Sequence, residues 1–243
     1  MLSFEGMKYR VRGEGLSILL LHGWGASSRS FATIESELSL DFRVYLVDLW
    51  GFGESQMPDP HATIYDYADV VYRFIRQVIG ESVVIVGHSF GGRIGLILGS
   101  RPLVSGLILV DSAGIKPRLT FAQKLRIRRY KSLRKRVELG RADASKLERF
   151  GSQDYRSLPT DLRGVFVRVV NEDLTKFAQI VDKPTLILWG RNDRTTPPKM
   201  ARKLHSLIGD SHLVWLHGGH FSYLDSPRDF LIQCKIFLNN LEK

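Results

Sequence analysis

The chain of 243 residues is 44% hydrophobic and 25% charged, which suits one compact domain with a sizeable core. Its one cysteine, Cys234, lies in the apolar pattern of a C-terminal helix and excludes an intrachain disulfide. No run of about 18 apolar residues predicts a membrane-spanning helix. Residues 1–15 lack the apolar core of a secretory signal, so we expect a cytoplasmic protein.

The formal net charge of +10 is concentrated in one part of the chain. Residues 112–182, hereafter the basic segment, contain 17 Lys/Arg and 8 Asp/Glu, whereas the rest of the chain contains 18 and 17. This concentration argues against a uniformly basic nucleic-acid binder.

Apolar runs typical of buried strands alternate with stretches of helical periodicity along most of the chain. This alternation predicts an α/β fold with a mostly parallel central sheet flanked by helices. The predicted strands, in chain order, are residues 7–11 at an edge of the sheet, 17–21, 44–47, 83–86, 107–110, 185–189 and 213–216. The predicted helices lie near residues 31–40, 64–79, 90–98, 199–207 and 227–241.

The alternation stops at residue 112 and resumes at residue 184. Between these points, apolar residues recur at helical spacing through a charged stretch. They are Phe121, Leu125, Tyr130, Leu133 and Val137. We therefore predict a core made of residues 1–111 and 183–243, with residues 112–182 inserted as a helical, basic cap over the catalytic face.

Residues 116–136 contain ten Lys/Arg and no acid. A solvated helix face explains such a run most simply. An acidic partner or substrate, such as an acidic carrier protein, is the next interpretation, followed by an anionic membrane surface. Nucleic acid is disfavoured because few aromatic side chains, such as Phe121 and Tyr130, interleave with the charges.

The run Val-Val-Ile-Val-Gly-His-Ser-Phe-Gly-Gly at residues 83–92 contains the most informative position, Ser89. A buried-strand signal ends at Gly87, and a helical stretch begins at Phe90. Glycines two positions before and after the serine permit the sharp strand-to-helix turn of a nucleophile elbow, which exposes the hydroxyl at the top of a sheet.

A serine nucleophile needs a base to accept its proton and an acid to orient that base. His220 follows the last predicted strand in a glycine-rich loop, and Asp193 follows the strand at 185–189. Both lie at carboxyl ends of strands, where α/β sheets bind ligands. Two alternatives remain open: His217 as the base, and Asp111, which ends the strand at 107–110, as the acid.

The turn His-Gly-Trp-Gly at residues 22–25 follows the strand at 17–21. Its Trp24 N–H, together with the Phe90 N–H, is predicted to form an oxyanion hole. His22, His88 and Asp48 are interpreted as residues that brace these loops. No metal-ligand spacing or phosphate-binding glycine loop occurs, so neither a metal nor a cofactor is expected.

Five ordered stretches resemble those of the α/β-hydrolase superfamily, specifically its small, capped serine hydrolases. They are H-G-W-G at 22–25, V-D-L-W-G-F-G-E-S at 47–55, G-H-S-F-G-G at 87–92, W-G-R-N-D at 189–193 and G-G-H-F at 218–221. The resemblance implies a triad of Ser89, Asp193 and His220, with Trp24 and Phe90 as oxyanion donors. The first two stretches also resemble carboxylesterases that cleave pimeloyl methyl esters in biotin synthesis, which have tryptophan where this chain has His88.

The expected activity is therefore cleavage of an ester, thioester or amide of a small to medium acyl substrate through an acyl-enzyme. Carbon–carbon bond hydrolysis uses the same triad and is an alternative, although the H-G-W-G turn lacks the Gly-Pro of typical ring-cleavage-product hydrolases. A ligand-binding regulator that keeps the triad is a second alternative, because a fold alone does not determine function.

Overall fold

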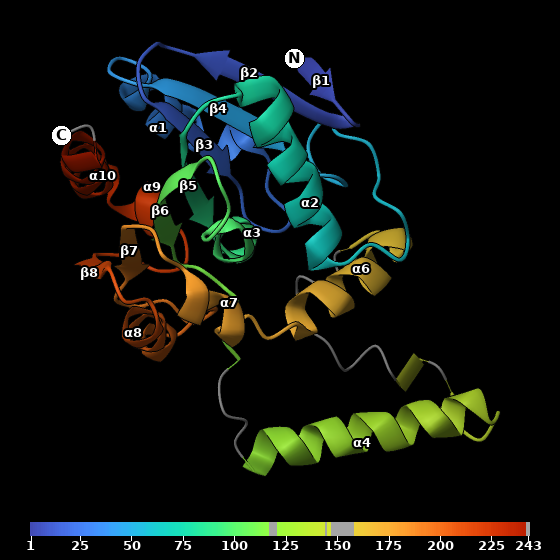
Figure 1. Ribbon diagram of the computed structural model, residues 1–243. Helices are drawn as coiled ribbons and strands as arrows, with labels where there is room; N and C mark the ends of the chain where they lie inside the picture. The colour runs from blue at the N-terminus through green and yellow to red at the C-terminus, as the bar shows by residue number, and fades with distance from the viewer. Residues whose placement is uncertain (117–120, 144, 147–157, 242–243) are drawn as a thin grey trace.

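The computed structural model describes residues 1–116, 121–143, 145–146 and 158–241 (Figure 1). In this part of the chain, eight strands form one sheet in the order β1-β2-β4-β3-β5-β6-β7-β8. β1 and β2 pair antiparallel with each other, and β2 pairs antiparallel with β4, whereas the other neighbours are parallel. The α/β fold with a mostly parallel sheet is thus confirmed.

Strands β2 to β8 match the apolar runs of the sequence to within three residues at either end. The bounds of all the strands are β1 Leu2–Phe4, β2 Met7–Arg12, β3 Ser17–Leu21, β4 Arg43–Asp48, β5 Val83–His88, β6 Val104–Val110, β7 Thr185–Gly190 and β8 Ser211–Leu216.

The prediction that residues 7–11 form an edge strand is wrong, because β1 lies outside β2. The two strands are joined by Glu5 and Gly6, which both have positive φ (45° and 81°), as a tight two-residue hairpin turn requires. A strand of three residues is too short to leave a recognisable apolar pattern.

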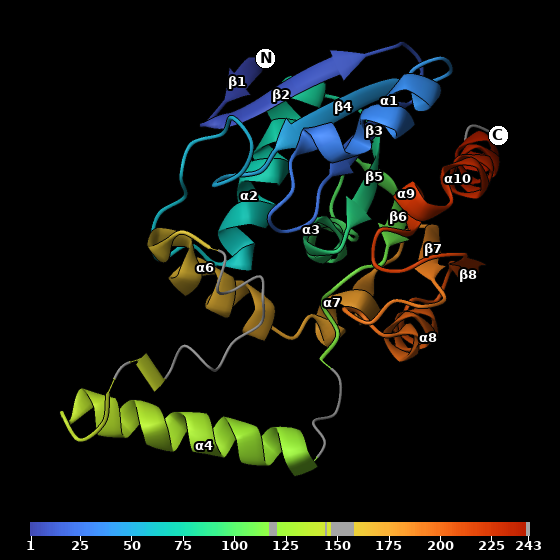
Figure 2. The same ribbon diagram turned by 180° about the vertical axis from the view of Figure 1, so that it is seen from behind.

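Helices cover both faces of the sheet (Figures 1 and 2). They are α1 Ala32–Leu38, α2 Ile64–Phe74, α3 Phe90–Leu98, α4 Phe121–Glu138, α6 Thr160–Asn171, α7 Thr175–Ile180, α8 Pro198–Leu207, α9 Ser222–Asp225 and α10 Pro227–Leu241. A 3₁₀ turn at Ser28–Phe31 precedes α1, and a π-helical turn at Ile75–Ile79 ends α2. The four-residue α9 was not predicted.

Alternate strand residues pack into two cores, one on each face, as the two-residue period of a strand requires. Leu19 and Leu21 pack with residues of α2, α3, α7 and α8. Ile18 and Leu20 pack with residues of α1 and α10, among them the fully buried Cys234. None of the described helices is long and apolar enough to span a membrane.

The basic segment lies between β6 and β7 in the chain and contributes α4, α6 and α7. α6 buries Leu162, Val165 and Val169 against the core. α4 lies farther out in both views, beyond α6 and α7 (Figures 1 and 2). The helical pattern at its start is correct, yet Phe121 is 81% exposed, so α4 does not bury that apolar residue.

Candidate active site

Ser89 lies between the end of β5 and the start of α3, with φ 48° and ψ −102°. This conformation is strained for a residue with a side chain, and it is held by a hydrogen bond from the Ser89 N–H to the Val110 carbonyl (3.0 Å). A Cβ on Gly91 would lie 2.1 Å from the Leu21 carbonyl oxygen, and one on Gly87 would lie 2.6 Å from the Gly91 backbone. The elbow therefore requires glycine at both positions.

The structure brings the three residues predicted as a triad into one hydrogen-bonded chain. The Ser89 hydroxyl lies 3.0 Å from His220 Nε2, and His220 Nδ1 lies 2.9 Å from Asp193 Oδ2. Ser89 is half-buried, the His220 side chain is 15% exposed, and the Asp193 side chain is buried. This arrangement lets the hydroxyl donate to a neutral imidazole whose other nitrogen donates to a carboxylate.

Asp193 lies in the loop after β7 and is held by several donors. Its Oδ1 accepts the N–H groups of Thr195 (2.7 Å) and Thr196 (2.9 Å), and its Oδ2 lies 2.6 Å from the Thr196 hydroxyl. Burial alone would raise the pKa of Asp193, but the hydrogen bonds from His220 and Thr196 hold it below its ordinary value. The carboxylate is therefore ionised at neutral pH.

The rival acid, Asp111, lies beneath these loops and does not contact His220. Its Oδ1 accepts the Gly190 N–H (2.7 Å), and its Oδ2 accepts the N–H (3.0 Å) and hydroxyl (2.6 Å) of Ser222. Burial raises the pKa of Asp111 to about 6. Asp111 therefore ties together the loops that contain Asp193 and His220.

The rival base, His217, is exposed, and its carbonyl accepts the Ser226 hydroxyl at 2.9 Å. In the described residues, its ring makes no hydrogen bond to Ser89 or to either candidate acid. The geometry therefore favours His220 over His217 as the partner of Ser89.

The turn at residues 22–25 lies directly beside Ser89. A Cβ on Gly23 would lie 3.5 Å from the Ser89 Cβ, and the His22 carbonyl accepts the Gly91 N–H at 3.1 Å. Trp24 follows Gly23, and Phe90 opens α3, where the first N–H groups of a helix have no partner within it. Both predicted oxyanion donors thus belong to segments that adjoin the serine.

Two buried histidines brace these segments, as the sequence indicates. His22 donates from Nδ1 to the Gly23 carbonyl (2.8 Å) and accepts the Leu49 N–H at Nε2 (3.0 Å). His88 donates from Nε2 to the His220 carbonyl (2.7 Å). Burial lowers the pKa of His22 to about 4 and, together with His220, lowers that of His88 to about 3, so both stay neutral.

Sequence reasoning missed the aromatic wall of the site. The Trp24 ring makes edge contacts with Phe52 (4.9 Å between centroids), Phe90 (5.0 Å) and Phe166 of α6 (5.1 Å). Phe52 lies in the 47–55 stretch, which indicated only the family resemblance, and no sequence signal indicated Phe166. The wall thus joins the turn at residues 22–25, the start of α3 and α6 through apolar rings.

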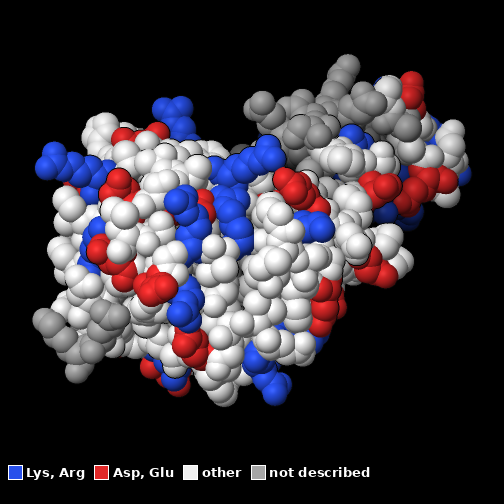
Figure 3. Space-filling view, turned by 90° about the horizontal axis from the view of Figure 1, so that it is seen from above, with Lys and Arg blue, Asp and Glu red and all other residues white. Residues whose placement is uncertain are grey.

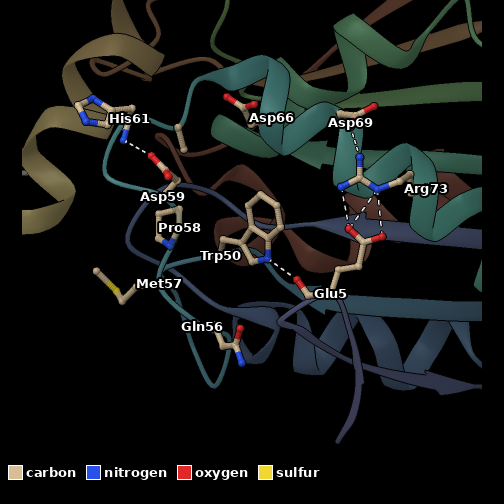
Figure 4. A pocket seen from close by; sticks show the side chains of 11 residues that line it. Glu5, Trp50, Gln56, Met57, Pro58, Asp59, His61, Asp66, Asp69 and Arg73 are labelled. Carbon is tan, nitrogen blue, oxygen red and sulfur yellow. Dashed lines mark hydrogen bonds and ion pairs between the residues drawn. The ribbon is translucent and has the colours of Figure 1, made fainter.

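A cavity of about 420 Å³ lies away from these residues, between the loop after β4 and α2 (Figure 4). Trp50 stands at its centre and donates from Nε1 to the Glu5 carbonyl (2.8 Å). Arg73 lines the cavity and pairs with Glu5 and Asp69. Neither Ser89, His220 nor Asp193 lines this cavity. Within the described residues, no group of three or more His, Cys, Asp or Glu is placed to hold a metal ion.

Residues 18–233 match the family model described as the alpha/beta hydrolase family. A pimeloyl-(acyl-carrier protein) methyl ester esterase of Pseudoalteromonas atlantica is 28% identical over 255 residues, covering 93% of this chain and 95% of the relative. A 2-hydroxy-6-oxo-6-(2'-aminophenyl)hexa-2,4-dienoic acid hydrolase of Metapseudomonas resinovorans is 29% identical, covering 96% and 87%. The structure of a thermophilic esterase from Thermogutta terrifontis is similar in fold, with a TM-score of 0.76, 23% identity, and coverage of 98% and 94%.

Proposed function

The chain belongs to the alpha/beta hydrolase family and is carboxylesterase-like, and we propose that it is a serine hydrolase that cleaves an ester, thioester or amide of a small to medium acyl compound. The observation that carries this proposal is the hydrogen-bonded chain from the Ser89 hydroxyl through His220 to Asp193. The strained backbone of Ser89 supports it, because strain of this kind clusters at functional sites.

In the proposed mechanism, Ser89 Oγ attacks the substrate carbonyl while His220 Nε2 accepts its proton. The carbonyl oxygen becomes an oxyanion, which the N–H groups of Trp24 and Phe90 stabilise. One such donor contributes about 3 kcal/mol to transition-state stabilisation. The tetrahedral intermediate collapses, His220 protonates the leaving group, and the acyl group remains on Ser89.

Water then releases the acyl group by the same steps in reverse, with His220 again accepting the proton. Asp193 is ionised at neutral pH because of its hydrogen bonds. It therefore holds Nδ1–H in place and stabilises the imidazolium that forms in each half-reaction. His22 and His88 remain neutral and do not compete for this proton.

Carbon–carbon bond hydrolysis is the second candidate, because one relative is named for a dienoic acid that contains no ester or amide bond. The same serine and histidine would act on a ketone carbonyl, and the leaving group would be a carbanion. The two reactions are distinguished by the substrate alone.

We further propose that the basic segment is a cap and that α4 attracts an acidic substrate or carrier protein. Its exposed basic residues are Arg126, Arg128, Arg129, Lys131, Arg134, Lys135 and Arg136. Within the described residues, the one ion pair on α4 joins Arg134 to Glu138. By contrast, Lys/Arg and Asp/Glu are interspersed over the body of the molecule in Figure 3. A relative named for a carrier-protein substrate supports the carrier interpretation.

The experiment that tests the proposed activity is steady-state hydrolysis of p-nitrophenyl esters from acetate to octanoate, beside a 2-hydroxy-6-oxo-dienoate. Repeated turnover of the esters with slower or no dienoate cleavage is the expected result. Faster cleavage of the dienoate would replace the proposal by carbon–carbon hydrolysis. One burst without turnover would instead identify a ligand-binding regulator.

A further inference from the structure

Arg93 is a charged side chain that is buried close to the active site. It follows Ser89 by one turn of α3, and its N–H lies 3.3 Å from the Ser89 carbonyl. Side chains of a helix lean toward its N-terminus, so Arg93 extends over the turn that begins at Ser89. The residue is only 5% exposed.

The guanidinium reaches across to the end of α6. Arg93 Nη2 lies 2.5 Å from the carbonyl oxygen of Glu172, the first residue after that helix. Two further backbone hydrogen bonds lie near this contact. One joins the start of the basic segment to the elbow, and the other joins the start of the segment to its end. The Ala113 N–H donates to the Ser89 carbonyl (3.1 Å), and the Leu174 N–H donates to the Gly114 carbonyl (2.9 Å).

This placement is costly, because a buried charge loses its hydration and Arg93 has no close ion pair among the described residues to offset that loss. None of the ion pairs among the described residues includes Arg93, and its Nε has no hydrogen-bond partner there. Burial lowers the pKa of Arg93 to about 10, so it still carries its charge at neutral pH. The carboxylates of Glu172 and Asp173 attract this charge without an ion-pair contact, and that of Glu172 accepts the Tyr65 hydroxyl at 2.7 Å.

α6 transmits the position of Glu172 to the wall of the site. Val165 and Val169 are fully buried against the core, and Phe166, between them, contacts the Trp24 ring. That ring also contacts Phe90, the residue that follows Ser89. Because α6 is a rigid helix, a shift at its C-terminal end moves Phe166. The contact between Arg93 and Glu172 therefore bears on the space available to an acyl chain.

We propose that Arg93 is a positioning residue that links α6 to the helix of the nucleophile and thereby sets which acyl chains the site accepts. This inference rests on the proposed hydrolase function. Arg93 contacts no substrate itself; it acts through the Glu172 carbonyl and Phe166.

The test compares Arg93→Met and Arg93→Lys with the wild type on p-nitrophenyl esters from acetate to octanoate. Methionine keeps much of the volume but removes the donors and the charge. With Arg93→Met, KM for octanoate is expected to rise at least about tenfold, while kcat/KM for acetate stays within about threefold. Arg93→Lys keeps a charged donor and should recover part of the long-chain activity.

Two matched variants identify the cause. Glu172→Gln keeps the backbone carbonyl and should leave chain-length selectivity unchanged. Arg73→Met removes an arginine from α2 that pairs with Glu5 and Asp69, and should also leave selectivity unchanged.

An equal loss on every ester would overturn the proposal, because it would mean that the elbow itself is damaged. Unchanged selectivity in a folded Arg93→Met protein would overturn it as well. If that variant does not fold, the chain-length profile of Arg93→Lys decides in the same way. Failure of the wild type on all esters would instead reject the proposed function.

Discussion

The surroundings of Ser89 and helix α4 use charge in different ways. Around Ser89, the carboxylates of Asp193 and Asp111 are buried and each accepts at least three hydrogen bonds. On α4, the Lys/Arg side chains that the structure describes are exposed. A buried group whose hydrogen bonds are all made is held in one geometry, and a catalytic reaction requires such a fixed geometry. Exposed charges instead act at long range and are screened by salt. Changes around Ser89 are therefore expected to affect kcat, whereas changes on α4 are expected to affect association with a charged substrate.

The largest effect is expected for Ser89→Ala. It should lower kcat for ester hydrolysis by about 10⁶-fold and leave a residual rate about 10³–10⁴-fold above water. The loss in kcat is measured by steady-state assays whose detection limit lies below that residual rate. Ser36→Ala, which changes an exposed serine of α1, is the control and should be active. Activity of Ser89→Ala within tenfold of the wild type would show that Ser89 is not the nucleophile.

Asp193→Asn should lower kcat by about 10⁴-fold, because the amide favours the wrong imidazole tautomer and cannot stabilise imidazolium. Asp111→Asn should lower kcat much less. Asp111→Asn should lower the melting temperature more than Asp193→Asn does. The Gly190 and Ser222 N–H groups both donate to the Asp111 carboxylate, and the amide leaves one of these buried donors without an acceptor. Measuring kcat and melting temperature for both variants tests this division. The reverse order in kcat would assign the acid to Asp111.

Activity should fall about tenfold per pH unit at acid pH, since a protonated imidazole cannot accept the serine proton. The fall should be visible above pH 4, because protonation of His220 leaves the Ser89 proton without an acceptor. The pKa values of His22 and His88, about 4 and about 3, are too low to cause it. Asp193, with its lowered pKa, stays ionised in this range. A pH profile of kcat/KM that is flat down to pH 4 would contradict the role of His220.

The smallest effect is expected on α4. Reversing the charges of Arg128, Arg129 and Lys131 should raise KM for an acidic carrier-bound substrate severalfold at low salt, and less at high salt. The kcat for a small neutral ester should not change. A control reverses three exposed charges of the core, at Arg76, Lys199 and Lys203. If both sets respond alike, the charge of α4 is only a solvated face.

Much of the fold follows from local patterns. The apolar runs of β3 to β8 are long enough to be recognised. The glycines of the elbow are recognisable as well, because any side chain there would clash, as a Cβ on Gly91 would with the Leu21 carbonyl. β1 and α9 are too short to carry a pattern. The prediction that residues 112–182 form a separate cap stays a prediction.

For the site, the motifs nominated Ser89, Asp193 and His220, which the structure brings together; their catalytic roles stay predictions. Asp111 and Asp193 both follow strands, and only the resemblance of the stretch at 189–193 favoured Asp193 in the sequence. The structure puts Asp193, and not Asp111, in hydrogen-bond contact with His220. Arg93 and Glu172 are 79 positions apart in the chain, and no local pattern indicates that they meet. The same holds for Phe166, which reaches Trp24 only through the packing of α6.

Labelling with a fluorophosphonate, followed by peptide mass spectrometry, tests directly whether Ser89 is a nucleophile activated by His220. One adduct is expected, on Ser89, that forms quickly in the wild type, slowly in His220→Ala and not at all in Ser89→Ala. An adduct on another residue, or equal labelling of the wild type and His220→Ala, would contradict a serine activated by His220.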